Sequence, residues 1–113
     1  MRLPGAARAV IDPAKLTDYL LSSAHPIGRF KAAYFARLGY FAEDWRLLEA
    51  VLLDVAASGT VQLVEETPFG SKYRVRGRIE TPTGGVVAVV TVWIVLSDED
   101  FPRFMTAFPG EDS

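Results

Sequence analysis

Apolar residues recur with a helical period in the first half of the chain and with a strand period in the second half. A first helix is predicted over residues 12–21, because Asp12 followed by proline is typical of a helix start. A second helix follows Pro26 and ends at Gly39, which tolerates the left-handed conformation. A third spans residues 43–57. The inward positions predicted for these helices are Leu16, Tyr19 and Leu20, then Phe30, Ala33, Tyr34 and Leu38, then Trp45, Leu48, Leu52 and Val55.

Side chains alternate between apolar and polar after Gly59, which predicts strands at residues 60–66, 72–80, 86–96 and 101–108. The third strand carries no charge and is predicted to be central and covered on both faces. Three N-terminal helices packed on one face of a four-stranded antiparallel sheet make an α+β fold. We expect one domain over residues 1–113, with an ordered core at about 10–108 and frayed ends at 1–8 and 110–113.

The composition narrows the possible chemistry. The 113 residues include no cysteine and one histidine, which excludes disulfides, a thiol nucleophile and cysteine-based metal sites. The acidic run at 98–100 is interpreted as a solvated turn, so no metal and no cofactor is predicted. No apolar run reaches the roughly 20 residues that span a bilayer, and the first residues lack a signal-peptide core. We expect a soluble, cytoplasmic protein without a membrane contact; the oligomeric state stays open.

A row of cations marks the second predicted strand. Lys72, Arg74, Arg76 and Arg78 alternate with uncharged residues, so they share one face. In a pleated strand they lie about 6.6 Å apart, close to the phosphate spacing of an extended single strand. The net charge of −2 means that any nucleic-acid site must be local. The row predicts RNA binding; the alternative is a solvated face that discourages edge aggregation.

The single histidine opens the second helix and suggests a phosphodiester site. His25 is a candidate general acid or base, and the helix amides with Arg29 and Lys31 are candidates for phosphate binding. Gly28 would let a phosphate approach the backbone closely. If this site is real, His25 and Lys31 should lie close enough to Arg74 or Arg76 to enclose one phosphate. In the alternative, the imidazole only caps free amides of the helix.

Thr91 is the only hydroxyl in the uncharged strand, and Trp93 shares its face. If that face is the cationic one, Thr91 can donate to a phosphate and Trp93 can stack on a base. If it is the other face, both are core residues. The turn at 82–85 allows two registers one residue apart, and a slip of one residue exchanges the faces.

Residues 25–40 carry the pattern His-Pro-x-Gly-x-x-Lys-Ala-x-x-Phe-x-x-Leu-Gly-aromatic, and residues 67–73 and 90–94 extend the likeness to about positions 10–108. The chain resembles a family of small bacterial domains of unknown function. More distantly it resembles the C-terminal toxin domains of contact-dependent inhibition and other polymorphic toxins. Many of these toxins are metal-independent RNases of the barnase/EndoU/colicin/RelE architecture. The resemblance implies a site that Thr91 and Trp93 line together with the histidine and lysine.

The leading hypothesis is a small metal-independent endoribonuclease, the toxin of a toxin–antitoxin or related conflict system. Its catalytic residues would be His25, Lys31 and Thr91, and its partner an acidic antitoxin or immunity protein. One alternative is a non-enzymatic module that binds RNA, a nucleotide or a protein. Another is that the chain is itself the neutralising partner of a second protein.

Overall fold

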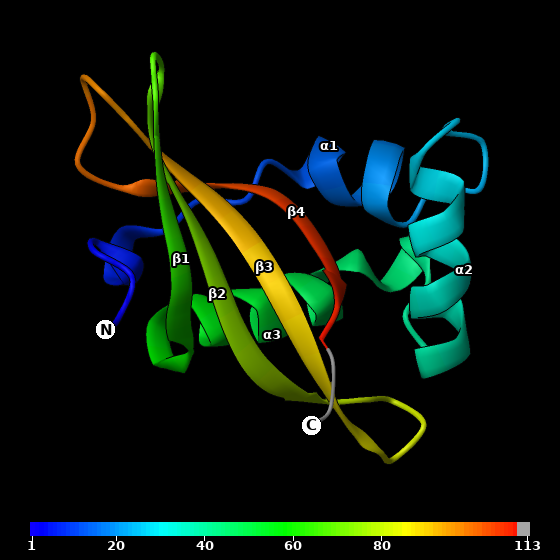
Figure 1. The fold of residues 1–113 in the computed structure, drawn as a ribbon. Coiled ribbons are helices and arrows are strands. Elements are labelled where there is room, and N and C mark those ends of the chain that lie inside the picture. Colours follow the sequence, from blue (N-terminus) through cyan, green and yellow to red (C-terminus); the bar gives the residue numbers. More distant parts are fainter. Residues whose placement is uncertain (111–113) are drawn as a thin grey trace.

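A four-stranded antiparallel sheet with the order β1-β2-β3-β4 forms the second half of the chain in the computed structural model, which describes residues 1–110. Each strand is joined to the next in sequence, so the sheet is a meander (Figure 1). β3 lies inside the sheet, as its lack of charge predicted. The strands are β1 (Thr60–Thr67), β2 (Gly70–Glu80), β3 (Val86–Leu96) and β4 (Pro102–Pro109).

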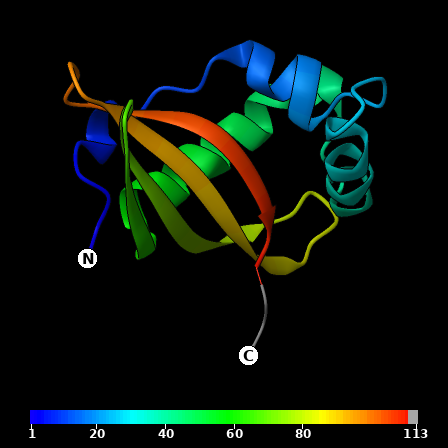
Figure 2. The same ribbon diagram turned by 45° about the horizontal axis from the view of Figure 1, so that its top comes forward.

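The helices precede the sheet and confirm the α+β class. α3 lies behind the sheet in Figures 1 and 2, while α1 and η2 lie beside β4, with α2 beyond them. Asp12 caps α1 as predicted, because its carboxylate accepts a hydrogen bond of 3.0 Å from the Ala14 amide. The helical elements are η1 (Ala6–Arg8), α1 (Pro13–Lys15), the π-helical turn η2 (Leu16–Leu20), α2 (Gly28–Leu38), η3 (Ala42–Asp44) and α3 (Trp45–Ser58).

The hydrophobic core lies between α3 and one face of the sheet. Leu48, Leu52 and Val55 of α3 are buried there, as the helical period predicted, and Trp45 is half-buried at the edge. They pack in one cluster with Val75 and Trp93 from the strands. We call this side of the sheet the core face, and the opposite side, which no helix of residues 1–110 covers, the outer face (Figure 2).

The register of β2 and β3 decides which residues share a face. Val75 lies opposite Thr91, and Tyr73 lies opposite Trp93. Thr91 and Trp93 therefore belong to the core face with Val75. The cations of β2 alternate with these positions and occupy the outer face.

The buried stripe of α2 differs from the predicted one. Phe30 is 68% exposed, whereas Gly28, Ala32 and Phe35 face the core. Apolar residues lie all around this helix, so the helical period alone does not select a face. Close packing decides which face of α2 is buried. Gly28 lies against the backbone of Tyr19, where a Cβ atom would overlap the Tyr19 carbonyl.

The expectation of a frayed N-terminus was wrong. Leu3 is 3% exposed and belongs to the core cluster. The Val61 amide donates to the Met1 carbonyl at 2.9 Å, and the Arg2 side chain donates to the Ala57 carbonyl. The first residues thus contact β1 and the end of α3. At the other end, the Gly110 amide donates to the Ala88 carbonyl, and the fraying predicted for residues 111–113 lies outside the described residues.

Candidate functional site

The outer face of the sheet combines a basic row with an apolar floor. Lys72 and Arg74 of β2 lie opposite Ile94 and Val92 of β3. Arg76 and Arg78 continue the row, opposite Val90 and Ala88. Val90 and Val92 are each only 7% exposed although no described helix covers them. The predicted cover on both faces is therefore found only on the core face. On the outer face, neighbouring side chains bury the middle of β3, and Val92 lines a pocket.

A bulge in β4 turns two further side chains toward this face. The pairing of β3 with β4 shifts between Val92 and Trp93, so Thr106 lies opposite Val92 while Phe104 lies opposite Trp93. The extra residue places Thr106 and Phe108 on the outer face and Phe104 in the core, although all three positions are even-numbered.

A pocket of about 270 Å³ opens on the outer face, and α2 contributes Lys31 to it. The pocket combines three cations, one carboxylate, one hydroxyl and an apolar floor. Its lining residues are Lys31, Leu63, Glu65, Lys72, Arg74, Val92, Met105, Thr106 and Phe108. The structure brings Lys31, Lys72 and Arg74 together in this pocket. Of the predicted set of His25, Lys31 and Arg74 or Arg76, it places Lys31 and Arg74 in the pocket lining, and His25 and Arg76 outside it.

Lys31 is held in the pocket by a short chain of hydrogen bonds. Its Nζ donates to Thr106 Oγ1 at 2.6 Å, and Thr106 Oγ1 lies 3.0 Å from the Tyr19 hydroxyl. A donor that is charged makes the shorter and stronger kind of hydrogen bond. These polar contacts therefore join side chains of α2, the π-helical turn η2 and β4 at the Thr106 hydroxyl.

Phe108 connects the cations of the helix and the sheet. The Lys31 Nζ lies 5.7 Å from the centroid of the Phe108 ring, and the Arg74 Cζ lies 5.8 Å from the same centroid. The Lys31 Nζ is also 5.8 Å from the centroid of the Tyr19 ring. Aromatic faces attract cations at such distances. The Phe108 ring is therefore within cation–π distance of two positive groups that line the pocket.

His25 caps α2 and does not line the pocket. Its Nδ1 accepts hydrogen bonds from the amides of Ile27 and Gly28 at 3.0 and 2.9 Å. Its ring packs edge-on against Tyr19, with 5.0 Å between the centroids. The capping interpretation describes this geometry, and the ring of His25 contacts Tyr19, whose hydroxyl meets Thr106 at the pocket.

Four other predicted site residues lie away from the pocket. Gly28 is buried against the Tyr19 carbonyl, so it offers no open backbone to a phosphate. Arg29 stacks on Phe30, 4.8 Å from the ring centroid, and lines a separate groove beside η3. Thr91 and Trp93 are fully buried on the core face.

Thr91 and Trp93 have a structural role of their own. Thr91 Oγ1 donates to the Val75 carbonyl at 3.0 Å and accepts from Trp93 Nε1 at 2.7 Å. The hydroxyl thereby satisfies the indole N–H that the core would otherwise leave without a partner.

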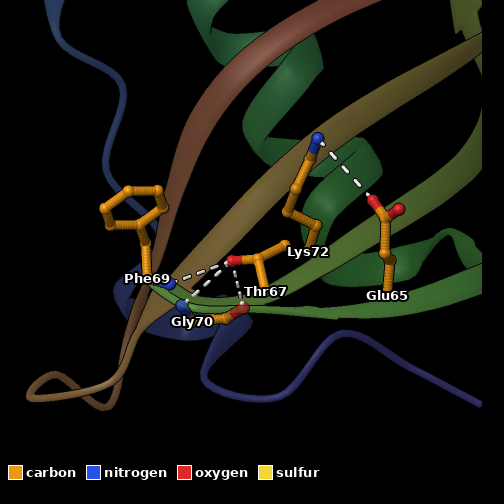
Figure 3. A network of polar contacts seen from close by, with 5 residues as sticks. All are labelled: Glu65, Thr67, Phe69, Gly70 and Lys72. Atoms are coloured by element: carbon orange, nitrogen blue, oxygen red, sulfur yellow. Dashed lines mark hydrogen bonds and ion pairs between the residues drawn. The ribbon is translucent and has the colours of Figure 1, made fainter.

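The β1–β2 hairpin carries Glu65 and Lys72 of the pocket lining, and Figure 3 shows its turn and these two side chains. Thr67 Oγ1 accepts from the amides of Phe69 and Gly70, each at 3.2 Å, and donates to the Gly70 carbonyl at 2.8 Å. This turn fixes Glu65 opposite Lys72, and their side chains approach to 3.8 Å between Oε1 and Nζ.

Sequence reasoning missed Tyr19, Thr106, Phe108 and Glu65 as site residues. Tyr19 fits a helix core stripe, and Glu65 is one of several acidic residues. Thr106 carried the clearest signal, as a hydroxyl between the apolar side chains of Met105 and Ala107.

Within residues 1–110 no cluster of acidic or histidine side chains has the geometry of a metal site. No helix in that part of the chain is long and apolar enough to span a bilayer.

The fold and the pocket define a class: a small α+β domain with α3 on one face of the sheet and a cationic pocket on the other. The chain belongs to the DUF6883 family, a domain of unknown function, whose profile matches residues 2–111. No curated protein sequence matches it. A chain in the structure of a contact-dependent growth inhibition toxin–immunity protein complex from Klebsiella pneumoniae 342 is similar, with a TM-score of 0.73 and 19% identity. The alignment covers 96% of this chain and 98% of that one, and at this identity it shows a shared fold.

Proposed function

We propose that this protein is a small metal-independent endoribonuclease and that the pocket on the outer face is its active site. The observation that carries the proposal is the contact of Lys31 with Thr106 and Tyr19, beside Arg74, at the wall of a basic pocket. Fixed cations and hydroxyls of this kind stabilise the charge that develops on a phosphate under attack.

The chemistry follows from the groups in the pocket. The RNA 2′-hydroxyl attacks the adjacent phosphorus and gives up its proton to water, the P–O2′ bond forms as the P–O5′ bond breaks, and the leaving 5′-oxygen takes a proton from water. The product carries a 2′,3′-cyclic phosphate. Lys31 and Arg74 neutralise the phosphorane, and Thr106 and Tyr19 hold the Lys31 ammonium in place. Lys72, Arg76 and Arg78 bind the flanking phosphates along β2.

His25 acts in this proposal as a positioning residue. Its ring supports Tyr19, and its Nδ1 holds the first turn of α2, which carries Lys31. Removing the imidazole should lower the rate less than removing the Lys31 ammonium does.

Cleavage of total RNA in EDTA tests the proposal. The wild-type protein should cut RNA and leave cyclic phosphate ends. Lys31→Ala should lower the rate by roughly two to four orders of magnitude, the contribution typical of a positioned catalytic group. Arg37→Ala, which removes an exposed cation from the same helix, is the matched control and should cut normally. Intact RNA at high wild-type concentration would refute the proposal.

We further propose that the protein is a toxin that acts in the cytoplasm of bacteria and has a cognate inhibitor. A chain of similar fold belongs to a toxin–immunity protein complex, which supports a role in a system of this kind. An acidic protein that covers the outer face would match its charge and block the pocket. An acidic protein encoded by the neighbouring gene should abolish cleavage at an equimolar ratio. A neighbouring protein that leaves cleavage unchanged would argue against this part of the proposal.

A non-enzymatic RNA-binding module is the second candidate, and the position of His25 favours it. The histidine caps a helix, and the pocket contains no imidazole. This module would bind RNA saturably, lose affinity as salt rises and leave the RNA intact. The same incubation in EDTA therefore separates the two functions.

A further inference from the structure

One carboxylate lines a pocket that is otherwise positive. Three cations, Lys31, Lys72 and Arg74, share the lining with Glu65. A carboxylate repels the phosphates of RNA, so its presence in a phosphate-binding pocket weakens binding unless it meets another part of the nucleotide. The nucleobase is the part that offers hydrogen-bond donors.

The ion pair with Lys72 leaves most of the Glu65 carboxylate available. The two groups are 3.8 Å apart, and their side chains are 62% exposed for Glu65 and 35% exposed for Lys72. Exposed pairs at such distances contribute little to stability. The Lys72 Nζ approaches Oε1 only to 3.8 Å, beyond hydrogen-bond distance, and the carboxylate is largely exposed, so its oxygens can accept hydrogen bonds from a ligand. Figure 3 shows the two side chains rising from the same side of the hairpin.

An apolar surface lies next to the carboxylate. Leu63 is two residues before Glu65 on β1 and is 50% exposed, and both line the pocket together with Val92 and Met105. Leu63 faces the outer side because it pairs with Arg74, beyond a bulge in β1. A nucleobase has flat faces that pack on apolar side chains and an edge that hydrogen-bonds.

We propose that Leu63 and Glu65 form a base-recognition subsite that selects guanine next to the scissile phosphate. This inference rests on the proposed function of the pocket in binding RNA. Guanine offers two adjacent donors on its Watson–Crick edge, N1–H and N2–H, which a carboxylate accepts together. Adenine and cytosine offer an amino group beside an acceptor, and uracil offers one N–H between two acceptors. Glu65 therefore makes two hydrogen bonds to guanine and at most one to any other base.

Glu66 provides a matched control. It is adjacent to Glu65 in the sequence, but it pairs with Ser71, whose Oγ lies 2.8 and 2.7 Å from its two carboxylate oxygens. Because strand residues alternate, Glu66 lies on the other side of the hairpin and does not line the pocket.

The test uses short oligo-uridine strands with 2′-O-methyl groups, which cannot be cleaved. Each strand carries one guanosine, inosine or adenosine. Fluorescence anisotropy at low salt should show guanine bound roughly five- to hundredfold tighter than adenine, as for a bidentate base contact. Inosine, which lacks the N2 amine, should fall between. Glu65→Gln should abolish this preference and bind plain oligo-uridine tighter, since one negative charge is gone. Glu66→Gln should keep the preference.

Two results would refute the proposed base-recognition subsite without refuting RNA binding by the pocket. One is equal wild-type affinity for guanine and adenine strands, and the other is an unchanged guanine preference in Glu65→Gln. The absence of binding to any strand would instead refute the proposed RNA site, and the base subsite with it. Tighter oligo-uridine binding by Glu65→Gln cannot arise from a misfolded variant, so a folding defect does not imitate the expected result.

Discussion

Replacing Thr91 with valine tests whether the buried hydroxyl serves the fold or the chemistry. Valine has nearly the same shape, so the variant removes the hydroxyl without opening a cavity. The Trp93 indole N–H would lose its acceptor at 2.7 Å, and the Val75 carbonyl would lose a donor at 3.0 Å. Both Thr91 and Trp93 are 0% exposed, so water cannot replace these partners.

The expected loss in the free energy of unfolding follows from these two contacts. A buried donor left without a partner costs about 1–3 kcal/mol, and the second hydrogen bond contributes about 1 kcal/mol. Thr91→Val should therefore lower the stability by about 2–4 kcal/mol. When Trp93→Phe removes the indole first, the same substitution should cost only about 1 kcal/mol, because no N–H remains to be orphaned.

Urea denaturation followed by far-UV circular dichroism measures all four proteins of this double-mutant cycle without relying on tryptophan fluorescence. RNA cleavage by Thr91→Val, measured well below its unfolding midpoint, should match that of the wild type. A stability within about 0.5 kcal/mol of the wild type would refute the structural role. A normal stability together with lost cleavage would place Thr91 in contact with RNA.

Two further predictions concern α2 and the loop before β4. Gly28→Ala should destabilise the protein by about 1–3 kcal/mol, because the new Cβ overlaps the Tyr19 carbonyl, and it should lower RNA cleavage because it displaces Tyr19. Thermal melts compare this variant with Gly85→Ala, whose Cβ meets only ordinary contacts. An unchanged melting temperature of Gly28→Ala would contradict the close packing of Gly28 on Tyr19. The hydrogen bond from Arg103 holds the pKa of Glu99 in the folded protein below its ordinary value of 4.5. The pair therefore stabilises the fold above about pH 4.5, and this stabilisation is lost as the pH falls through the lowered pKa of Glu99. Urea midpoints at pH 7 and pH 3 should therefore differ less in Glu99→Gln than in the wild type, and an equal difference would show that the pair contributes nothing.

The sequence by itself determined the class of the fold and the extent of its strands. The change of period after Gly59 predicted a helical half and a sheet half, because a helix and a strand place neighbouring side chains differently along the chain. The uncharged strand at 86–96 was correctly predicted to be central. The alternation at 72–78 correctly placed four cations on one face, and that face forms part of the pocket.

Tertiary structure alone decided which residues meet at the site. The register between β2 and β3 put Thr91 and Trp93 in the core, since a shift of one residue would have exchanged the two faces. The bulge in β4 brought Thr106 to the pocket, and a bulge is not visible in the periodicity of so short a strand. The contact of Lys31 with Thr106 joins residues 75 positions apart. Local patterns specify elements, whereas pairing between distant elements specifies the site, because it depends on how their surfaces pack.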